Sequence, residues 1–298
     1  MRHKRKEPAI MPMVNHDVNW HPEILIKKKL FLFDIDGTIA LSDNVIEGTR
    51  ELLSYIKRIG GRAIYITNNS SKSTADYMKR FERMGLSADP GDFVTAGNFT
   101  IDYFKERHLN DRTFVVATDS YFTELKKAGL NVTDEYDADA KIVLVCFDTD
   151  LKYSKIENAC RLLCDKSKER IFLATNADLR CPVDFGMIPD CGSICNMITA
   201  ATDATPEYLG KPAPGLVNYS MKITGFSPEE TIVVGDRIYT DIACGENAGV
   251  NTCLVFTGEA KEKDILTAKN HIDLAFPSVK ELYLTILREL KKAGEEKA

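Results

Sequence analysis

Short apolar runs alternate along this chain with segments in which apolar residues recur every three or four positions. The segment 52–59 carries leucine and isoleucine at helical spacing before a Gly-Gly pair, and 77–84 repeats such a pattern before Gly85. Seven apolar runs have the length of a strand, at 30–35, 62–67, 113–118, 141–147, 170–175, 231–236 and 251–256. Their alternation with helical segments predicts an α/β protein with parallel sheets.

Polar side chains gather just past the carboxyl ends of four of these predicted strands. The clusters lie at 34–38, 67–71, 175–178 and 235–241. Lys211 adds a positive charge in the loop Gly-Lys-Pro-Ala-Pro-Gly, which leads into a helix predicted over 215–223. Because open α/β sheets bind ligands beyond the carboxyl ends of their strands, these clusters form the candidate site.

The first cluster, in FLFDIDGTIA at 31–40, places Asp34 and Asp36 two residues apart. On an extended chain their carboxylates share one face, where they repel unless one is protonated or a cation lies between them. One carboxylate can attack phosphorus, and the other can protonate the leaving oxygen and later activate water. Gly37 would let the backbone approach a phosphate. A plain Asp-Gly turn or a helix cap is the alternative.

The second cluster, Thr-Asn-Asn-Ser-Ser at 67–71, follows a predicted strand and precedes a predicted helix. The hydroxyls and amides of Thr67 and Asn68, together with the free N–H groups of a helix start, make a phosphate site. Helix capping alone explains Ser71 or Ser73, but it does not explain five small polar residues in a row.

The last cluster, VVGDRIYTD, ends a predicted strand with Asp236 and places Asp241 five residues later. Magnesium takes oxygen ligands and keeps several waters, so a few carboxylates suffice to bind it. Asp241 serves equally well as an acid in the first turn of the next helix. Lys211, taken alone, is most simply a surface lysine.

Several other chemistries are excluded by the motifs. An EF-hand loop starting at Asp34 would need glycine and glutamate where the chain has Ile39 and Val45. None of the five histidines falls in a strand-end cluster, which argues against a Ser-His or Cys-His nucleophile. The chain also lacks the GxxxxGK[ST] phosphate loop and a GxGxxG dinucleotide turn after a strand.

Composition narrows the class of protein further. At 298 residues the chain is long enough for two folding units, and its net charge of -5 gives no reason to expect a nucleic-acid partner. Neither a membrane-spanning run nor a signal-peptide core is present, so we expect a cytoplasmic protein. The eight cysteines do not form a disulfide framework; their i, i+4 pairs favour buried thiols over a zinc site.

Together, DIDGT, ITNNS, GKPAP and GDRIYTD, in this order, resemble the four motifs of the haloacid dehalogenase-like phosphatases. TNNSS, ATNAD, CGSI and GKPAPG make the chain most similar to the NagD-like or p-nitrophenylphosphatase-like branch. The resemblance spans about 29–258 and implies a Rossmann-like parallel-sheet core with helices on both faces, plus an inserted α/β cap domain. It implies a core at 29–90 and 189–298, a cap at 91–188, and leaves 1–28 as an N-terminal arm.

The resemblance also implies roles for individual residues. Asp34 matches the nucleophile that becomes phosphorylated, and Asp36 matches the general acid and base. Thr67, with Asn68, matches the phosphate-holding position of the second motif. The implied cofactor is Mg²⁺, with Asp34 in its ligand group and the main-chain carbonyl of Asp36 bound to it.

The later motifs complete this implied site. Lys211 matches the cation that bridges nucleophile and phosphate, Asp236 matches a direct magnesium ligand, and Asp241 matches one that holds the metal through water. In the cap, Asn176 and Asp178 are candidates for substrate contact.

The leading hypothesis is therefore a magnesium-dependent phosphatase of small phosphate monoesters that works through an aspartyl phosphate. The expected partner is a small-molecule substrate, with no nucleic acid and no membrane, and a homodimer is possible. Two alternatives stay open: a noncatalytic protein that binds phosphorylated metabolites, and a phosphotransferase with an acceptor other than water. The identity of the substrate is open as well.

Overall fold

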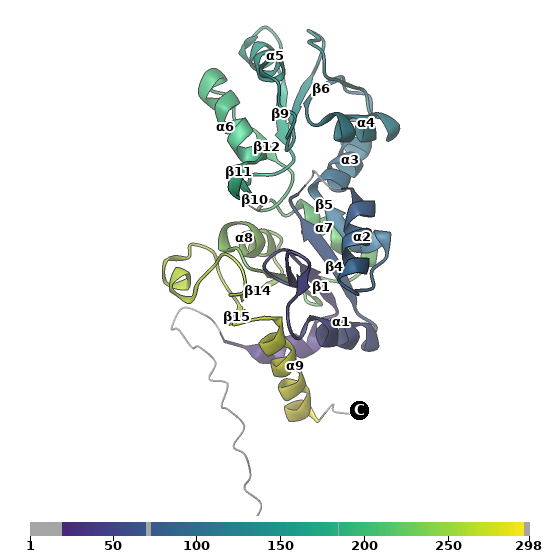
Figure 1. The fold of residues 1–298 in the computed structure, drawn as a ribbon, viewed down its shortest axis with the longest axis vertical. Coiled ribbons are helices and arrows are strands. Elements are labelled where there is room, and N and C mark those ends of the chain that lie inside the picture. The colour runs from purple at the N-terminus through teal and green to yellow at the C-terminus, as the bar shows by residue number, and fades with distance from the viewer. Residues whose placement is uncertain (1–19, 70–72, 184, 295–298) are drawn as a thin grey trace, which may run out of the picture.

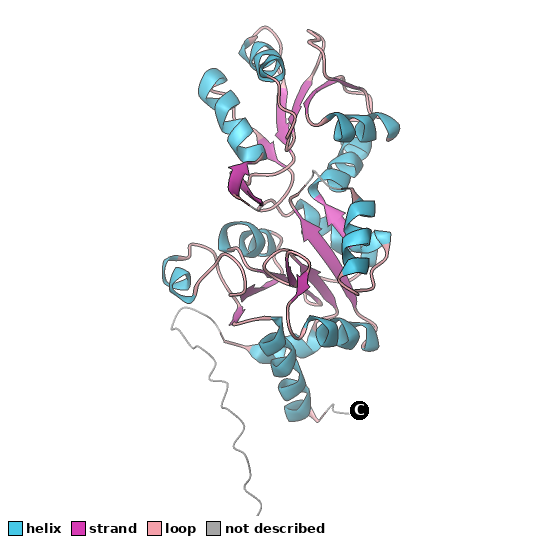
Figure 2. Cartoon of the chain, viewed as in Figure 1, coloured by secondary structure: helices cyan, strands magenta, loops and turns pink. Residues whose placement is uncertain are grey.

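The computed structural model describes residues 20–69, 73–183 and 185–294, and it contains two parallel sheets, one above the other in Figure 1. All seven predicted strands are present, and the prediction of an α/β fold with parallel sheets is confirmed. Figure 2 shows the helices that flank both sheets. In the described ranges, no helix combines the length and the apolar character that crossing a membrane requires.

The larger sheet, which we call the core sheet, has six strands in the order β15-β14-β13-β1-β4-β5. These strands are β1 (Leu30–Phe33), β4 (Arg62–Thr67), β5 (Phe93–Thr95), β13 (Thr231–Gly235), β14 (Asn251–Val255) and β15 (Leu274–Phe276). Adjacent strands pair in parallel throughout. In chain order this is the arrangement 3-2-1-4-5-6 of a doubly wound sheet, whose order reverses between β1 and β13.

Alternating side chains of each core strand pack on opposite faces of the core sheet. Leu30 and Leu32 of β1 face α7 (Gly215–Thr224) and α8 (Ala243–Asn247). Phe31 and Phe33 face the other side, which is covered by α1 (Thr49–Arg58), α2 (Thr74–Arg83) and α9 (Val279–Ala293). Both faces are buried, as is usual for an all-parallel sheet.

The smaller sheet, which we call the cap sheet, has the order β12-β9-β8-β6-β7. Its strands are β6 (Thr113–Val116), β7 (Val132–Thr133), β8 (Ile142–Val145), β9 (Ile171–Ala174) and β12 (Glu207–Tyr208). One face packs on α5 (Tyr153–Cys164) and α6 (Cys191–Thr202). The other packs on α4 (Asp119–Lys127) and α3 (Ala96–Arg107), and its apolar cluster continues into the core.

The chain passes from core to cap, and back again, at later residues than the sequence indicates, as the pairing of the strands shows. The predicted cap begins at 91, yet β5 pairs with β4 of the core sheet. The predicted core resumes at 189, yet α6 packs on the cap sheet and β12 pairs with β9. The cap therefore starts with α3, near residue 96, and ends after β12, near residue 209. Strands of two or three residues carry too little periodicity to show this in the sequence.

Two small hairpins and the ends of the chain complete the fold. The hairpin of β2 (Ala40–Leu41) and β3 (Asn44–Val45) follows β1, and that of β10 (Arg180–Val183) and β11 (Gly186–Pro189) follows β9. Of the predicted arm 1–28, residues 1–19 lie outside the described ranges. Its last part is not an arm, because a 3₁₀ helix at Pro22–Lys27 buries Leu25 against the core.

The eight cysteines are free thiols. Five of them are buried, at Cys146, Cys191, Cys195, Cys244 and Cys253.

Candidate active site

The candidate site lies where the strand order of the core sheet reverses. Asp34 directly follows β1 and Asp236 directly follows β13, and these two strands are neighbours. Asp34 N donates to Val234 O at 3.0 Å, which continues the ladder to the last residues of both strands. Because parallel neighbours end at the same edge, two aspartates that are 202 positions apart in sequence are brought side by side.

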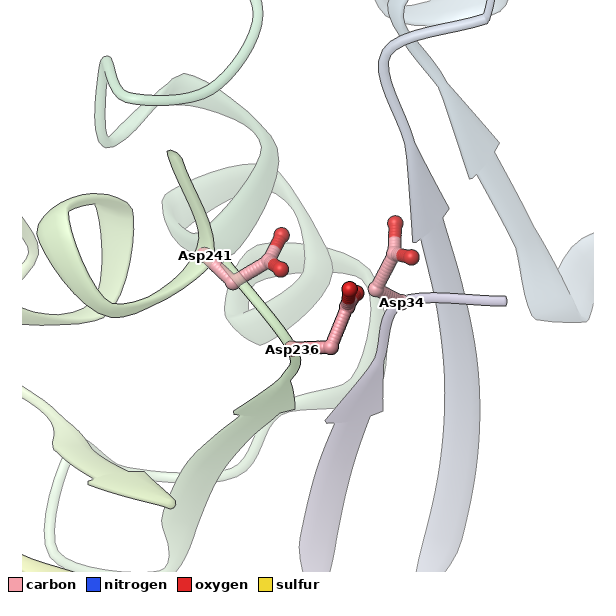
Figure 3. A group of neighbouring side chains, drawn as sticks. All are labelled: Asp34, Asp236 and Asp241. Atoms are coloured by element: carbon pink, nitrogen blue, oxygen red, sulfur yellow. The ribbon is translucent and has the colours of Figure 1, made fainter. Parts of the chain in front are cut away.

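Asp241 joins them from a π-helical turn at Ile238–Ile242. Carboxylate oxygens of Asp34, Asp236 and Asp241 lie within 4.8 Å of one another, and Figure 3 shows the three side chains converging. The wider turn of a π segment is often found at functional sites. Asp241 Oδ2 also accepts a hydrogen bond from Arg237 N at 3.0 Å, which fixes the carboxylate over the end of β13.

Lys211 neutralises part of this negative charge. Its Nζ donates to Asp34 Oδ1 and to Asp241 Oδ1, both at 2.7 Å, and the side chain is 3% exposed. Burial on its own would lower the pKa of Lys211, but Asp241 and Asp34 outweigh it and raise the pKa. The two aspartates therefore favour the charged form of Lys211.

The carboxylates keep an excess of negative charge despite Lys211. Burial raises the pKa of Asp34, and Asp241 and Asp236 raise it further against the opposing effect of Lys211. Burial, followed by Asp241, raises the pKa of Asp236 as well. Three carboxylates balanced by one lysine favour either a proton or a further cation.

The donor set fits a hard divalent cation such as Mg²⁺. Asp236 Oδ1 is buried and has no hydrogen-bond partner, whereas Oδ2 of the same carboxylate accepts from Glu259 N at 2.7 Å. A buried, unpartnered carboxylate oxygen is costly unless a ligand completes it. Oxygen ligands from carboxylates are those that magnesium prefers.

Two glycines make room for the Asp236 carboxylate. Gly37 has a φ of 91°, and a Cβ on it would lie 2.7 Å from Asp236 Oδ2. A Cβ on Gly258 would overlap the same oxygen. Gly37 N donates to Ala40 O at 2.8 Å, so this amide is used within the turn. The structure thus explains Gly37 by its close approach to Asp236, whereas the sequence suggested approach to a phosphate.

Asp36 is not one of the three clustered carboxylates, and it pairs instead with Arg80 of α2. Arg80 Nη2 and Nη1 donate to the two carboxylate oxygens at 2.6 and 3.1 Å. Arg80 is 8% exposed, and it also donates to Ser42 O and lies 3.3 Å from Asp43 Oδ1 in the turn between β2 and β3. A bidentate arginine of this kind fixes the orientation of a carboxylate that is otherwise half exposed.

The second cluster divides into residues with different surroundings. Thr67 ends β4 and is buried, and its Oγ1 accepts from Asn69 N at 3.2 Å. The side-chain amide nitrogen of Asn68 donates two hydrogen bonds, to Asp178 Oδ2 at 2.6 Å and to Lys211 O at 2.9 Å. Its side chain therefore has no donor left for a phosphate. Residues 70 and 71 of this cluster lie outside the described ranges.

The two cap candidates are placed otherwise than the sequence suggests. Asn176 is completely buried, and its amide donates to Asp178 Oδ2 and to Asp190 Oδ1, both at 3.0 Å. Asp178 is 6% exposed and is occupied by Asn68, Asn176 and Arg237. Contact of either side chain with a substrate is not supported, because their polar atoms already have partners inside the protein.

Sequence reasoning missed two arginines, Arg80 and Arg237. Arg237 stands inside the quoted motif GDRIYTD, directly after Asp236, so its place at a strand end was a usable signal. Arg80 gave no such signal, because a charge on an amphipathic helix usually faces solvent.

Comparison with known proteins identifies the family of this chain. A family model described as haloacid dehalogenase-like hydrolase matches residues 31–131, and a second, described as HAD-hydrolase-like, matches 208–282. An acid sugar phosphatase of Staphylococcus epidermidis is 31% identical over 235 residues, which is 79% of this chain and 89% of that protein.

Solved structures are similar over most of their length. A 4-nitrophenylphosphatase from Thermotoga maritima superposes with a TM-score of 0.81 at 33% identity, covering 88% of this chain and 99% of that one. NagD from Escherichia coli K-12 gives 0.77 at 29% identity, covering 85% and 98%. The chain belongs to the haloacid dehalogenase-like hydrolases, in the branch that resembles NagD and the p-nitrophenylphosphatases.

Proposed function

We propose that this hydrolase is a magnesium-dependent phosphatase of small phosphate monoesters that works through an aspartyl phosphate on Asp34. The observation that supports this proposal most strongly is the geometry at the end of β1. There the Asp34 carboxylate accepts a hydrogen bond from Lys211 and lies beside Asp236 and Asp241. The phosphatases among its relatives support the same reaction. Positioning and charge neutralisation are what phosphoryl transfer chiefly requires.

The proposed first step transfers the phosphoryl group to Asp34. A carboxylate oxygen of Asp34 attacks phosphorus while the bond between phosphorus and the ester oxygen breaks. Asp36, released from its pair with Arg80 and protonated, gives a proton to the leaving oxygen, and the alcohol departs. In the second step Asp36 takes a proton from water, the water oxygen attacks phosphorus, and Asp34 and inorganic phosphate are released. The Thr67 hydroxyl donates to the phosphoryl oxygens, and Lys211 offsets their charge.

Mg²⁺ would be held by Asp34, the Asp36 carbonyl and Asp236, and Asp241 would hold it through water. When bound, it supplies the positive charge that lets an anionic carboxylate approach an anionic phosphate. The observed support on this chain is the unpartnered Asp236 Oδ1 beside two further carboxylates.

The substrate class stays at small phosphate monoesters, and sugar phosphates rank first because several relatives are named acid sugar phosphatases. Nucleotides and other metabolite phosphates are the next candidates. A cytoplasmic location and a homodimer remain predictions. Noncatalytic binding of phosphometabolites is the alternative outside enzymology, and the intact pair of Asp34 and Asp36 favours catalysis over it.

Phosphate release from a panel of small phosphomonoesters tests the proposal, with Mg²⁺ or with EDTA. We expect release that depends on Mg²⁺ and is abolished in Asp34→Asn. The matched control is Asp139→Asn, which changes a cap carboxylate that is 86% exposed and pairs with Lys168. Incorporation of labelled water oxygen into phosphate separates hydrolysis from transfer to another acceptor. Undiminished release by Asp34→Asn would refute the mechanism.

A further inference from the structure

Asp178 belongs to the cap and is firmly held there. It lies between β9 and β10, and its main-chain oxygen accepts a hydrogen bond from Gly192 N at 2.8 Å, at the start of α6. The same stretch leaves no space for a side chain at position 192, because a Cβ there would collide with the carbonyl groups of Ala177 and Asp178. The carboxylate of Asp178 is thus presented by a rigid part of the cap.

Its side chain nevertheless reaches into the core. Asp178 Oδ2 accepts from Asn68 Nδ2 at 2.6 Å, a contact between residues 110 positions apart. Asn68 in turn brackets the peptide of Lys211: its Oδ1 accepts from Lys211 N at 2.8 Å, and its Nδ2 donates to Lys211 O at 2.9 Å. One cap carboxylate therefore orients the amide that fixes the main chain of the lysine bonded to Asp34.

The other carboxylate oxygen meets Arg237 of the core. Arg237 Nη1 donates to Asp178 Oδ1 at 3.3 Å, and its Nε lies 3.1 Å from Glu259 Oε2. Arg237 thus joins a cap acid to a core acid directly beside Asp236.

Gly210 packs closely against Asn68. A Cβ on Gly210 would lie 2.6 Å from Asn68 Oδ1 and 2.6 Å from Thr175 O. Gly210 N donates to Thr175 O at 2.8 Å, so the pairing of β12 with β9 continues up to the residue before Lys211. Cap and core meet at this point through close-packed, directional contacts.

We propose that Asp178 is a positioning residue that ties the cap to Asn68 and Arg237, so that docking of the cap sets the geometry of Thr67 and Lys211. Asp178 does not touch substrate in this arrangement. The proposal rests on the proposed phosphatase function, because it concerns the same phosphate pocket. Removal of the tie displaces the phosphate-binding groups, and a displacement of about 1 Å can cost about 10²-fold in rate.

The test compares Asp178→Asn with Asp190→Asn. Both variants neutralise a buried carboxylate that accepts from Asn176. The hydrogen-bond donors to the Asp190 carboxylate among the described residues, Asn176 and Cys191, both lie in the cap. We measure kcat/KM for p-nitrophenyl phosphate and for a sugar phosphate, and the inhibition constant of inorganic phosphate. Asp178→Asn should lower kcat/KM about 10- to 100-fold by the same factor for both esters and weaken phosphate inhibition. Asp190→Asn should change each value less than about threefold.

Three outcomes would overturn the proposal. Unequal losses for the two esters would mean that Asp178 contacts the organic part of the substrate. An unchanged phosphate inhibition constant would mean that the phosphate pocket does not depend on Asp178. Equal losses in Asp190→Asn would mean that any buried charge lost from this part of the cap has the same effect.

Hydrogen exchange separates this proposal from the function on which it rests, because it needs no turnover. Exchange at residues 66–69 and 235–239 should become faster in Asp178→Asn and stay unchanged in Asp190→Asn, even if no ester is hydrolysed. If Asp178→Asn does not fold, Arg237→Gln removes the other end of the contact. It should accelerate exchange at 177–179, and unchanged exchange there would overturn the proposal.

Discussion

Replacing Lys211 by methionine should reveal how strongly the site's carboxylates depend on their one buried lysine. The substitution keeps most of the length and apolar stem of the side chain but removes the ammonium. Asp34 and Asp241 then each lose a contact of 2.7 Å, and Asp241 is 1% exposed. The three clustered carboxylates then lose the ammonium that bonds two of them, while the charged Arg237 remains next to Asp236.

The expected loss of stability follows from the burial of Lys211 and of the aspartates that it contacts. Breaking a buried ion pair by removing one member costs about 3–5 kcal/mol, because the remaining charge stays buried without a partner. For a chain of this size 1 kcal/mol corresponds to roughly 2 °C in the midpoint of thermal unfolding. We therefore expect Lys211→Met to unfold about 6–10 °C below the wild type in EDTA.

Thermal unfolding in EDTA and in Mg²⁺ is the assay. A cation at a hundred times its dissociation constant adds about 2.7 kcal/mol to the folded state. Since the variant offers the cation more uncompensated charge, Mg²⁺ should narrow the gap to the wild type. The control is Lys222→Met, which removes a lysine that is 64% exposed and pairs with Glu106 at the surface. Its cost should stay below about 1 kcal/mol.

The reasoning is refuted if Lys211→Met in EDTA costs no more than Lys222→Met. It is also refuted if added Mg²⁺ widens the difference between Lys211→Met and the wild type, since the carboxylates would then not be acting as a cation site.

Two further predictions concern the cap. Lys155 Nζ donates to Asp148 Oδ2 at 2.7 Å inside the cap, so Lys155→Met should lower the free energy of unfolding in urea by about 3–5 kcal/mol. The double variant Lys155→Met, Asp148→Leu should recover most of that loss, because no buried charge is left without a partner. Equal losses in the single and the double variant would contradict the ion-pair account. Burial raises the pKa of Asp190 to about 6, so the folded state holds this proton more tightly than the unfolded state and wild-type stability is lost as the pH rises from about 4 to 6. Asp190→Asn removes that loss, which linkage puts at about 3 kcal/mol, and parallel stability curves for variant and wild type between pH 4 and 7 would show the prediction wrong.

The longer strands could be predicted from the sequence because their apolar runs are long enough to stand out from the residues around them. β4 coincides with the predicted 62–67, and β13 and β14 lie inside the predicted ranges. β5 and β12 have three and two residues, and these two strands decide where the cap begins and ends. Their assignment depends on which sheet they pair with, and pairing is a property of the folded chain.

In the candidate site, too, some features could be predicted from the sequence and others depend on the folded chain. Asp34 and Asp236 were predictable neighbours, because both follow strands and parallel strands end at one edge. The partners of Arg80 and Arg237 lie 44 and 59 positions away, and no local pattern links them. The sequence also did not reveal the partners of Asn176 and Asp178, since a motif does not show whether a polar side chain faces a ligand or another buried group.

The apolar cluster that extends from the core sheet into the cap has a consequence for how the molecule unfolds. Val115, Ile142 and Leu144 of the cap belong to the same cluster as Leu30 and Ile64 of the core. Helix α3 contributes Phe99 and Phe104 to this cluster, and Figure 1 places it between the two sheets. An excised cap would expose this surface to water, and transplanting it onto another core would demand a matching apolar face. We therefore expect the cap and the core to unfold together, with a single melting transition as the calorimetric signature.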